Sequence, residues 1–196
     1  MSLKRGLSLA SLAAAAALAG CGGGSALDNS ENVQNPPGAG GRKLSFEYFQ
    51  RCVQPIYEKV ITGAGGGSNT CGSSGCHDTV AGTGGALRIV PRPAIVDSTT
   101  TAVDVIHASE MFRNFFSSQG VTVIGAPTAS RLFQKPLILN ILHGGGQIFA
   151  DQNDPNAKII AYWITHPMPE GQDEFSPVAG NLFTTGDPKT GACKDQ

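Results

Sequence analysis

Two cysteines and a histidine lie close together in the segment 70–77, which reads TCGSSGCH. Two thiols followed directly by an imidazole are the arrangement that attaches a c-type haem, with thioether bonds to the haem vinyl groups and the histidine on the iron. The usual motif has two residues between the cysteines, whereas two glycines and two serines separate Cys71 from Cys76 here. Because glycine tolerates unusual backbone conformations, the longer loop can bulge. We therefore predict one covalently attached haem c, held by Cys71 and Cys76, with His77 as the proximal iron ligand.

A second ligand is expected on the other side of the iron, and several residues could supply it. His143 is the first candidate because three glycines follow it, and glycine lets the backbone approach a flat porphyrin closely. Met168 is the runner-up because the flanking prolines hold its loop rigid, and a thioether ligand raises the reduction potential relative to a second imidazole. His107 fits a structural role among apolar neighbours, and His166 fits an exposed one. A distal side without a protein ligand is a further alternative.

The first 20 residues indicate export rather than a folded element. A basic start is followed by an apolar run that is too short to span a bilayer stably, and this run ends in LAGC at 18–21. Small residues before a cysteine resemble the bacterial lipoprotein signal, so we predict a signal peptide over 1–20 and lipidation of Cys21. The alternative is an ordinary secretory signal with a chance cysteine.

Export also bears on the two cysteines that remain, Cys52 and Cys193. The compartment outside the inner membrane is oxidising, so the simplest expectation is a disulfide between them. The alternative is a buried Cys52 and a free Cys193 near the end of the chain.

Composition divides the rest of the chain into a tether and one domain. Residues 21–43 are rich in Gly, Ser, Asn and Pro, which predicts a flexible tether, and residues 44–196 are long enough for one domain. The chain has 26 Gly, 12 Pro and only 7% aromatic residues, so we expect a loop-rich domain whose modest core a haem would complete. Its tail over 170–196 is expected to be mostly irregular. The formal net charge of −1 argues against nucleic-acid binding.

Helical periodicity accounts for most of the apolar residues of this domain, so the predicted fold class is mainly α. Ser45 can cap a helix over 46–53, which Pro55 is expected to kink or restart. Further helices are expected over 101–116, over 130–142 and over 155–164. Pro136 is expected to split the second of these, and Asp154 is a good N-cap for the third.

Several short motifs occur in an order that resembles a known family. They are CxxxxCH at 71–77, GGALRI at 84–89, KPL at 135–137, HGGG at 143–146 and WI at 163–164. This order is similar to the cytochrome c-like modules of bacterial envelope proteins, including the large planctomycete surface proteins. The resemblance implies a small cytochrome c-like domain with its N- and C-terminal helices packed together, and it favours His143 on the haem side. Trp163 is expected in the core, and Lys135 and Arg88 are candidate partners for the haem propionates.

These features together predict a lipid-anchored monohaem cytochrome c that transfers electrons to or from a redox partner protein. Contact with the membrane is expected through the lipid alone. Gly22 differs from the aspartate that retains lipoproteins at the inner membrane of enteric bacteria, which favours the bacterial outer membrane, facing the periplasm or the outside. No hydrolase triad or acid–base cluster stands out, so we expect an electron carrier rather than an enzyme.

Three alternatives remain open from the sequence. The first is a non-redox envelope lipoprotein, a binding or scaffold module in which Cys71 and Cys76 form a structural disulfide. The second is a zinc site made by these cysteines with His77 and His143. The third is a haem enzyme such as a peroxidase, which requires an open iron site.

Overall fold

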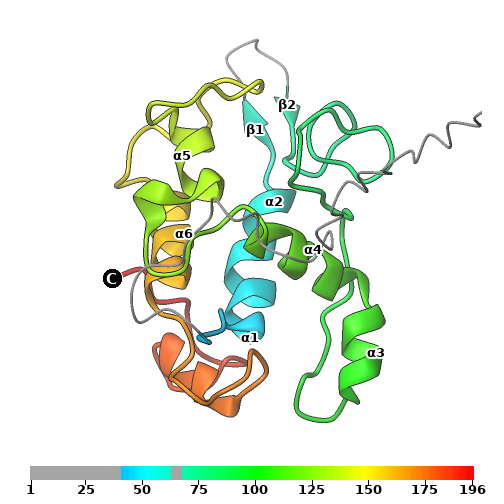
Figure 1. Ribbon diagram of the computed structural model, residues 1–196, viewed down its shortest axis with the longest axis vertical. Helices are drawn as coiled ribbons and strands as arrows, with labels where there is room; N and C mark the ends of the chain where they lie inside the picture. Colours follow the sequence, from blue (N-terminus) through cyan, green and yellow to red (C-terminus); the bar gives the residue numbers. More distant parts are fainter. Residues whose placement is uncertain (1–40, 63–67) are drawn as a thin grey trace, which may run out of the picture. The chain divides into compact units, whose positions relative to one another are not determined.

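Helices make up most of the regular structure in the computed structural model, which describes residues 41–62 and 68–196 (Figure 1). Six α-helices and one antiparallel hairpin, β1 (Ile61–Thr62) with β2 (Ser68–Asn69), lie in these ranges, so the fold class is mainly α, as predicted. The predicted signal peptide, Cys21 and most of the predicted tether lie outside the described residues. No helix in this part of the chain is both long and apolar enough to cross a membrane.

The first helical rod is continuous across a proline. It consists of α1 (Phe46–Tyr48), a π-helical turn, η1 (Phe49–Val53), and α2 (Gln54–Glu58). The sequence predicted a kink or a restart at Pro55, and a new α-helix, α2, does begin at Gln54 with this proline in its first turn. Pro55 has no N–H to donate, and the preceding turn is widened so that the backbone N–H of Gln54 reaches the carbonyl of Phe49, five residues back. The π turn therefore absorbs the missing hydrogen bond without ending the helix.

The last long helix, α6 (Pro155–Thr165), packs against this rod. The helix begins where the sequence predicted. Asp154 is its N-cap, and the Asp154 side chain accepts a hydrogen bond from the backbone N–H of Asn156 at 2.8 Å. Trp163 of α6 is fully buried, with its ring centroid 5.5 Å from that of Phe49. The packing of N- and C-terminal helices that the sequence predicted is thus present, and Trp163 lies in the core.

Between these elements, α3 (Val103–Ala108) and α4 (Glu110–Gln119) replace the single helix expected over 101–116. The break is at Ser109, whose backbone is extended at φ −73° and ψ 154°. Its side-chain oxygen accepts a hydrogen bond from the backbone N–H of Phe112, so Ser109 begins a new helix instead of continuing the old one.

The helix α5 (Arg131–Leu137) follows a 3-10 turn, η2 (Pro127–Ala129). Pro136 was expected to split a longer helix over 130–142. It lies instead in the last turn of α5, and the helix ends at Ile138, which is left-handed with φ 53° and ψ 41°. The segment beyond Ile138 is consequently a loop, and this loop carries His143.

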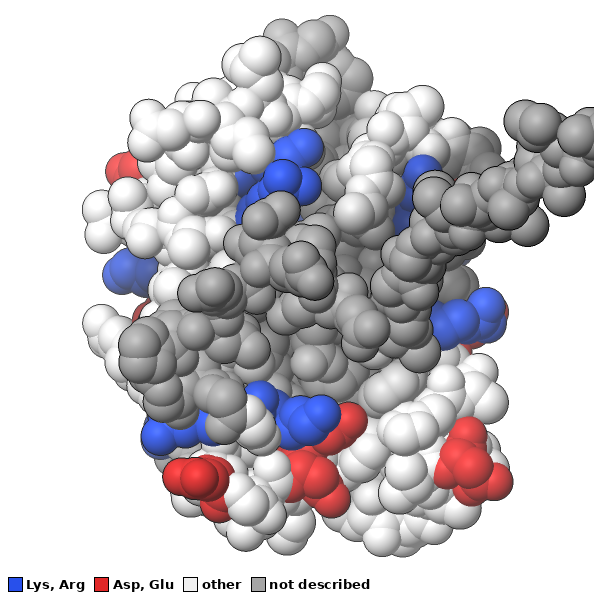
Figure 2. Space-filling model, viewed as in Figure 1, with Lys and Arg blue, Asp and Glu red and all other residues white. Residues whose placement is uncertain are grey.

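The carboxyl-terminal tail is mostly irregular, apart from a 3-10 turn, η3 (Pro177–Leu182). A disulfide between Cys52 and Cys193 fastens this tail to the first helical rod, with 5.9 Å between the two Cα atoms. The Tyr48 hydroxyl adds a hydrogen bond to the carbonyl of Lys194. On the face shown in Figure 2, most Asp and Glu side chains lie in the lower part, and Lys and Arg side chains lie mainly above them.

Two buried amide side chains hold the long loop between Leu87 and Ala102. Asn114 donates to the carbonyl of Val90 at 2.8 Å and accepts from its N–H at 2.7 Å. Gln50 pairs in the same way with Val96, with both hydrogen bonds at 3.0 Å. Each amide thus satisfies both backbone groups of one loop residue, as a neighbouring β-strand would.

Replacing Asn114 by Ala is expected to lower the free energy of unfolding by about 1–3 kcal/mol, because it leaves the half-buried N–H and C=O of Val90 without their partner. Chemical denaturation followed by circular dichroism measures this change. Asn153→Ala is the matched control, because Asn153 is exposed and should give a change within about 0.5 kcal/mol. Equal effects of the two substitutions would show that Asn114 does not hold the loop.

Candidate functional site

A cavity of about 570 Å³ lies between α2, α5, the loop after Cys71 and the loop after His143. This volume is in the range of pockets that hold small organic ligands and cofactors, about 300–1,000 Å³. Its walls are mainly apolar and include Ile56, Tyr57, Leu87, Val121, Leu132, Ile148, Phe149 and Ile160. Both cysteines of the predicted motif and both His77 and His143 also line it, so the tertiary structure brings these four residues together.

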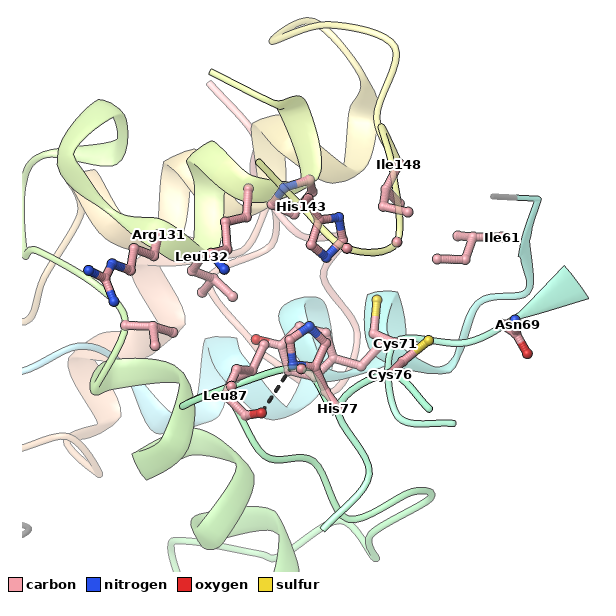
Figure 3. A pocket seen from close by; sticks show the side chains of 18 of the residues that line it. Ile61, Asn69, Cys71, Cys76, His77, Leu87, Arg131, Leu132, His143 and Ile148 are labelled. Carbon is pink, nitrogen blue, oxygen red and sulfur yellow. Dashed lines mark hydrogen bonds between the residues drawn. The ribbon is translucent and has the colours of Figure 1, made fainter. Parts of the chain in front are cut away.

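The two imidazoles face each other across the cavity (Figure 3). Their ring centroids are 6.2 Å apart and their planes differ by only 12°. His77 comes from the loop after the cysteines and His143 from the loop after α5, so the pair connects two distant segments of the chain. The ring centres are far enough apart for one metal atom to lie between the two histidines, bound through a nitrogen at the edge of each ring.

Hydrogen bonds fix the orientation of both rings. The Nδ1–H of His77 donates to the carbonyl of Leu87 at 3.0 Å, and the Nδ1–H of His143 donates to the carbonyl of Gly146 at 2.8 Å. A carbonyl can only accept, so the proton of each neutral ring is on Nδ1 and the lone pair is on Nε2. This is the arrangement in which a histidine binds a metal, with its second nitrogen held by the protein.

The electrostatics favour the neutral, metal-binding form of His77. Burial lowers the pKa of His77, while the hydrogen bond to Leu87 opposes this effect. The nearby charges of His143 and Lys135 lower the pKa of His77 further. Since an unperturbed histidine titrates near pH 6.5, a lowered pKa leaves this ring neutral at pH 7.

Both cysteine sulfurs lie on one side of His77 (Figure 3), and neither is in a disulfide. Two turns fold the longer loop between them: Ser73 N–H donates to Thr70 at 3.1 Å and Cys76 N–H donates to Ser73 at 3.0 Å. His77 N–H then donates to the carbonyl of Cys71 at 3.0 Å. Burial, followed by the proximity of Cys76, raises the pKa of the Cys71 thiol to about 11, so this thiol is protonated at neutral pH.

A glycine lies against each imidazole. A Cβ atom on Gly84 would be 2.3 Å from Nδ1 of His77 and 2.7 Å from the carbonyl of Cys76, so no side chain fits there. A Cβ atom on Gly145 would be 3.2 Å from Cε1 of His143, which is also a tight contact. The glycine-rich segments of the sequence therefore let the backbone pack directly on the rings.

Replacing Gly84 by Ala is expected to displace His77 and to lower the free energy of unfolding of the haem-free chain by about 1–3 kcal/mol, the usual cost of overpacking. Gly144→Ala is the matched control, because Gly144 lines the same cavity but its Cβ would meet nothing within 4 Å. Denaturation of the two variants side by side measures the difference. A Gly84 variant as stable as the Gly144 variant would contradict the close contact with His77.

The other predicted ligands lie elsewhere. Met168 is buried outside the cavity, and its backbone N–H donates to the carbonyl of Lys43 at 2.7 Å. His107 packs against Phe112, with ring centroids 4.3 Å apart, and His166 stacks on Tyr162 at 3.8 Å. None of these three residues lines the cavity, so the tertiary structure does not bring them to His77.

The structure changes which cations are candidate partners of the propionates. Arg88 was predicted, but it donates to the carbonyls of Asp78 and Gly82 and does not line the cavity. Arg131 was not predicted, but it lines the cavity together with Lys135. The available signal was their spacing, because residues four apart lie on the same face of a helix.

The zinc alternative finds no support. Among the residues that the structure describes, no group of three or more His, Cys, Asp and Glu side chains is arranged to hold a metal ion. Paired imidazoles beside two thiols in an apolar cavity fit a metal that brings its own organic ligand.

Comparison with known proteins adds no relative: no family model, no curated protein and no solved structure matches this chain.

Proposed function

We propose that this protein is a lipid-anchored monohaem c-type cytochrome that transfers electrons in the bacterial cell envelope. The observation that carries the proposal is the pair of facing imidazoles, His77 and His143, beside two free thiols in one apolar cavity. The sequence motif supplies the attachment chemistry, and the position of His143 supplies a second axial ligand.

The spacing of the two rings matches coordination of one metal atom by both. A metal–imidazole bond is about 2 Å long, and two such bonds plus the distance from each nitrogen to its ring centre give about 6 Å. The observed centroid distance is 6.2 Å. Both Nδ1 atoms are engaged with carbonyls, which leaves Nε2 of His77 and of His143 as the ligating atoms.

The thiols of Cys71 and Cys76 supply the covalent links. Each thiol adds across one vinyl double bond: the sulfur bonds to one carbon, the thiol hydrogen goes to the other, and no electrons are lost. This chemistry requires reduced sulfurs, and neither Cys71 nor Cys76 is in a disulfide, whereas Cys52 is joined to Cys193. The contrast favours the cytochrome over the module with a Cys71–Cys76 disulfide.

Haem supplies a one-electron Fe(III)/Fe(II) couple, and the protein sets its potential through the axial ligands and burial. His77 and His143 would both hold the iron, and a metal held by two side chains of the protein would favour electron transfer over reaction with a substrate. A redox partner protein and an outer-membrane lipid anchor at Cys21 remain part of the proposal.

The test is expression of the full chain with a cytochrome c maturation system. We expect a c-type pyridine haemochrome spectrum, and an intact mass that keeps one haem after acid–acetone extraction. Cys71→Ala and Cys76→Ala should each lose one thioether bond, and the double variant should lose all extraction-resistant haem. Ser74→Ala is the matched control, because Ser74 is exposed in the same loop, carries no thiol and does not line the cavity.

The opposite result would remove the electron-transfer proposal. A chain that retains no haem, and in which mass spectrometry finds Cys71 bonded to Cys76, would be a non-redox envelope module.

A further inference from the structure

Positively charged side chains line the cavity without negatively charged ones in the part of the chain that the structure describes. Arg131 and Lys135 line it, and no Asp or Glu does so among the described residues. Neither cation takes part in a salt bridge in this part of the chain. Lys135 is half-buried and Arg131 is exposed at the rim. Cations beside an apolar cavity without carboxylate partners indicate an anionic ligand group.

The position of these cations relative to the cysteines also indicates which part of a ligand they bind. Figure 3 shows Cys71 and Cys76 on one side of the paired imidazoles and Arg131 on the other. Lys135 follows Arg131 by one helical turn, so both project from the same face of α5. In haem, the vinyl groups and the two carboxylates lie on opposite edges of the ring. The cavity has the same order: thiols, imidazoles, cations.

We propose that Arg131 and Lys135 form a carboxylate-binding edge of the cavity, which binds the haem propionates and so determines which edge of the ring meets the cysteines. This inference rests on the proposed function and assigns an orientation to its cofactor. Arg131 is suited to a two-pronged hydrogen bond with a carboxylate, and Lys135 supplies a second, more buried charge. Arg88 is not assigned this role because it does not line the cavity, and one nitrogen of its guanidinium already donates to two backbone carbonyls.

The test compares two iron porphyrins that differ only at the carboxylates, haem and haem dimethyl ester. The full chain carries Cys71→Ser and Cys76→Ser, so that each porphyrin binds without attachment, and absorption titration gives each dissociation constant. We expect haem to bind more tightly than its ester. Arg131→Gln with Lys135→Gln should weaken haem binding about ten- to hundredfold, the size expected for lost charge-assisted hydrogen bonds, and leave ester binding unchanged.

Arg113→Gln is the matched control, because it removes the same charge from an exposed site outside the cavity. A preference for haem that survives in the Arg131/Lys135 variant overturns the inference and leaves the proposed function intact. If neither porphyrin binds, the inference about Arg131 and Lys135 is overturned, and the proposal that the protein binds haem is also weakened.

A second measurement avoids reconstitution. In the mature protein with covalent haem, the propionate bending band of the resonance Raman spectrum should shift in Arg131→Gln and in Lys135→Gln, and stay unchanged in Arg113→Gln. A band unaffected by either cavity substitution would show that these cations do not bind the carboxylates.

Discussion

In the proposed cytochrome, replacing His143 by Ala is expected to convert the iron from a six-coordinate, low-spin state to a five-coordinate, high-spin state. The reason is that His143 is the residue that faces His77 across the cavity, with ring centroids 6.2 Å apart. Absorption and electron paramagnetic resonance spectra distinguish the two states. Covalent attachment should be unaffected, because the thiols of Cys71 and Cys76 remain.

Free imidazole provides a rescue of this variant. Removing the side chain of His143 leaves a space beside the iron, so added imidazole should restore the low-spin spectrum. A variant that is merely misfolded would not respond in this way.

Met168→Leu and His107→Ala are the controls for the identity of the ligand. Neither residue lines the cavity, so both variants should keep the low-spin spectrum. Loss of that spectrum in the Met168 variant, with its retention in the His143 variant, would assign the distal position to Met168 instead.

Replacing both Cys52 and Cys193 by Ala is expected to lower the free energy of unfolding by about 4–5 kcal/mol, because the disulfide closes a very long loop. The two cysteines are 141 positions apart and join the first helical rod to the tail. Domains of this size are stable by only about 5–15 kcal/mol, so this one bond supplies at least about a quarter of the free energy of unfolding. Urea denaturation of the haem-free chain measures the loss.

A background with Cys71→Ser and Cys76→Ser prevents thiol exchange in this experiment. In that background, a reductant should destabilise the chain with Cys52 and Cys193 to the level of the double Ala variant, and should not affect the variant itself. Equal stability with and without reductant in both chains would contradict a stabilising role for the disulfide.

Local signals in the sequence predicted the elements well where one residue decides the backbone. Asp154 caps α6 through a hydrogen bond two residues away, and this short range makes the start of the helix readable from the sequence. Ser109 can also cap a helix, but the sequence predicted a continuous helix across it. Whether a serine caps or continues a helix depends on its ψ angle, which packing of the flanking helices decides.

Pro55 is a second residue whose effect on the backbone was partly predictable. A proline removes one hydrogen bond in any helix, so the sequence predicts a kink or a restart there. A new α-helix does begin at Gln54. The sequence did not predict the π turn over Phe49–Val53, because the proline rule gives the place of the lost hydrogen bond and not the backbone geometry that compensates for it.

For the candidate site, the sequence by itself determined which reactive residues lie close together along the chain. It placed two thiols and His77 in one loop and put glycines near each histidine. It also left two further cysteines that could pair. These features can be read from the order and number of the residues alone. Only the tertiary structure decided that His143, and not Met168, faces His77, and that Arg131 and not Arg88 shares the cavity with Lys135. The physical reason is that the packing of α6 on the first rod, and of α5 on α6, sets the distances between segments far apart in the chain. No local pattern encodes those distances.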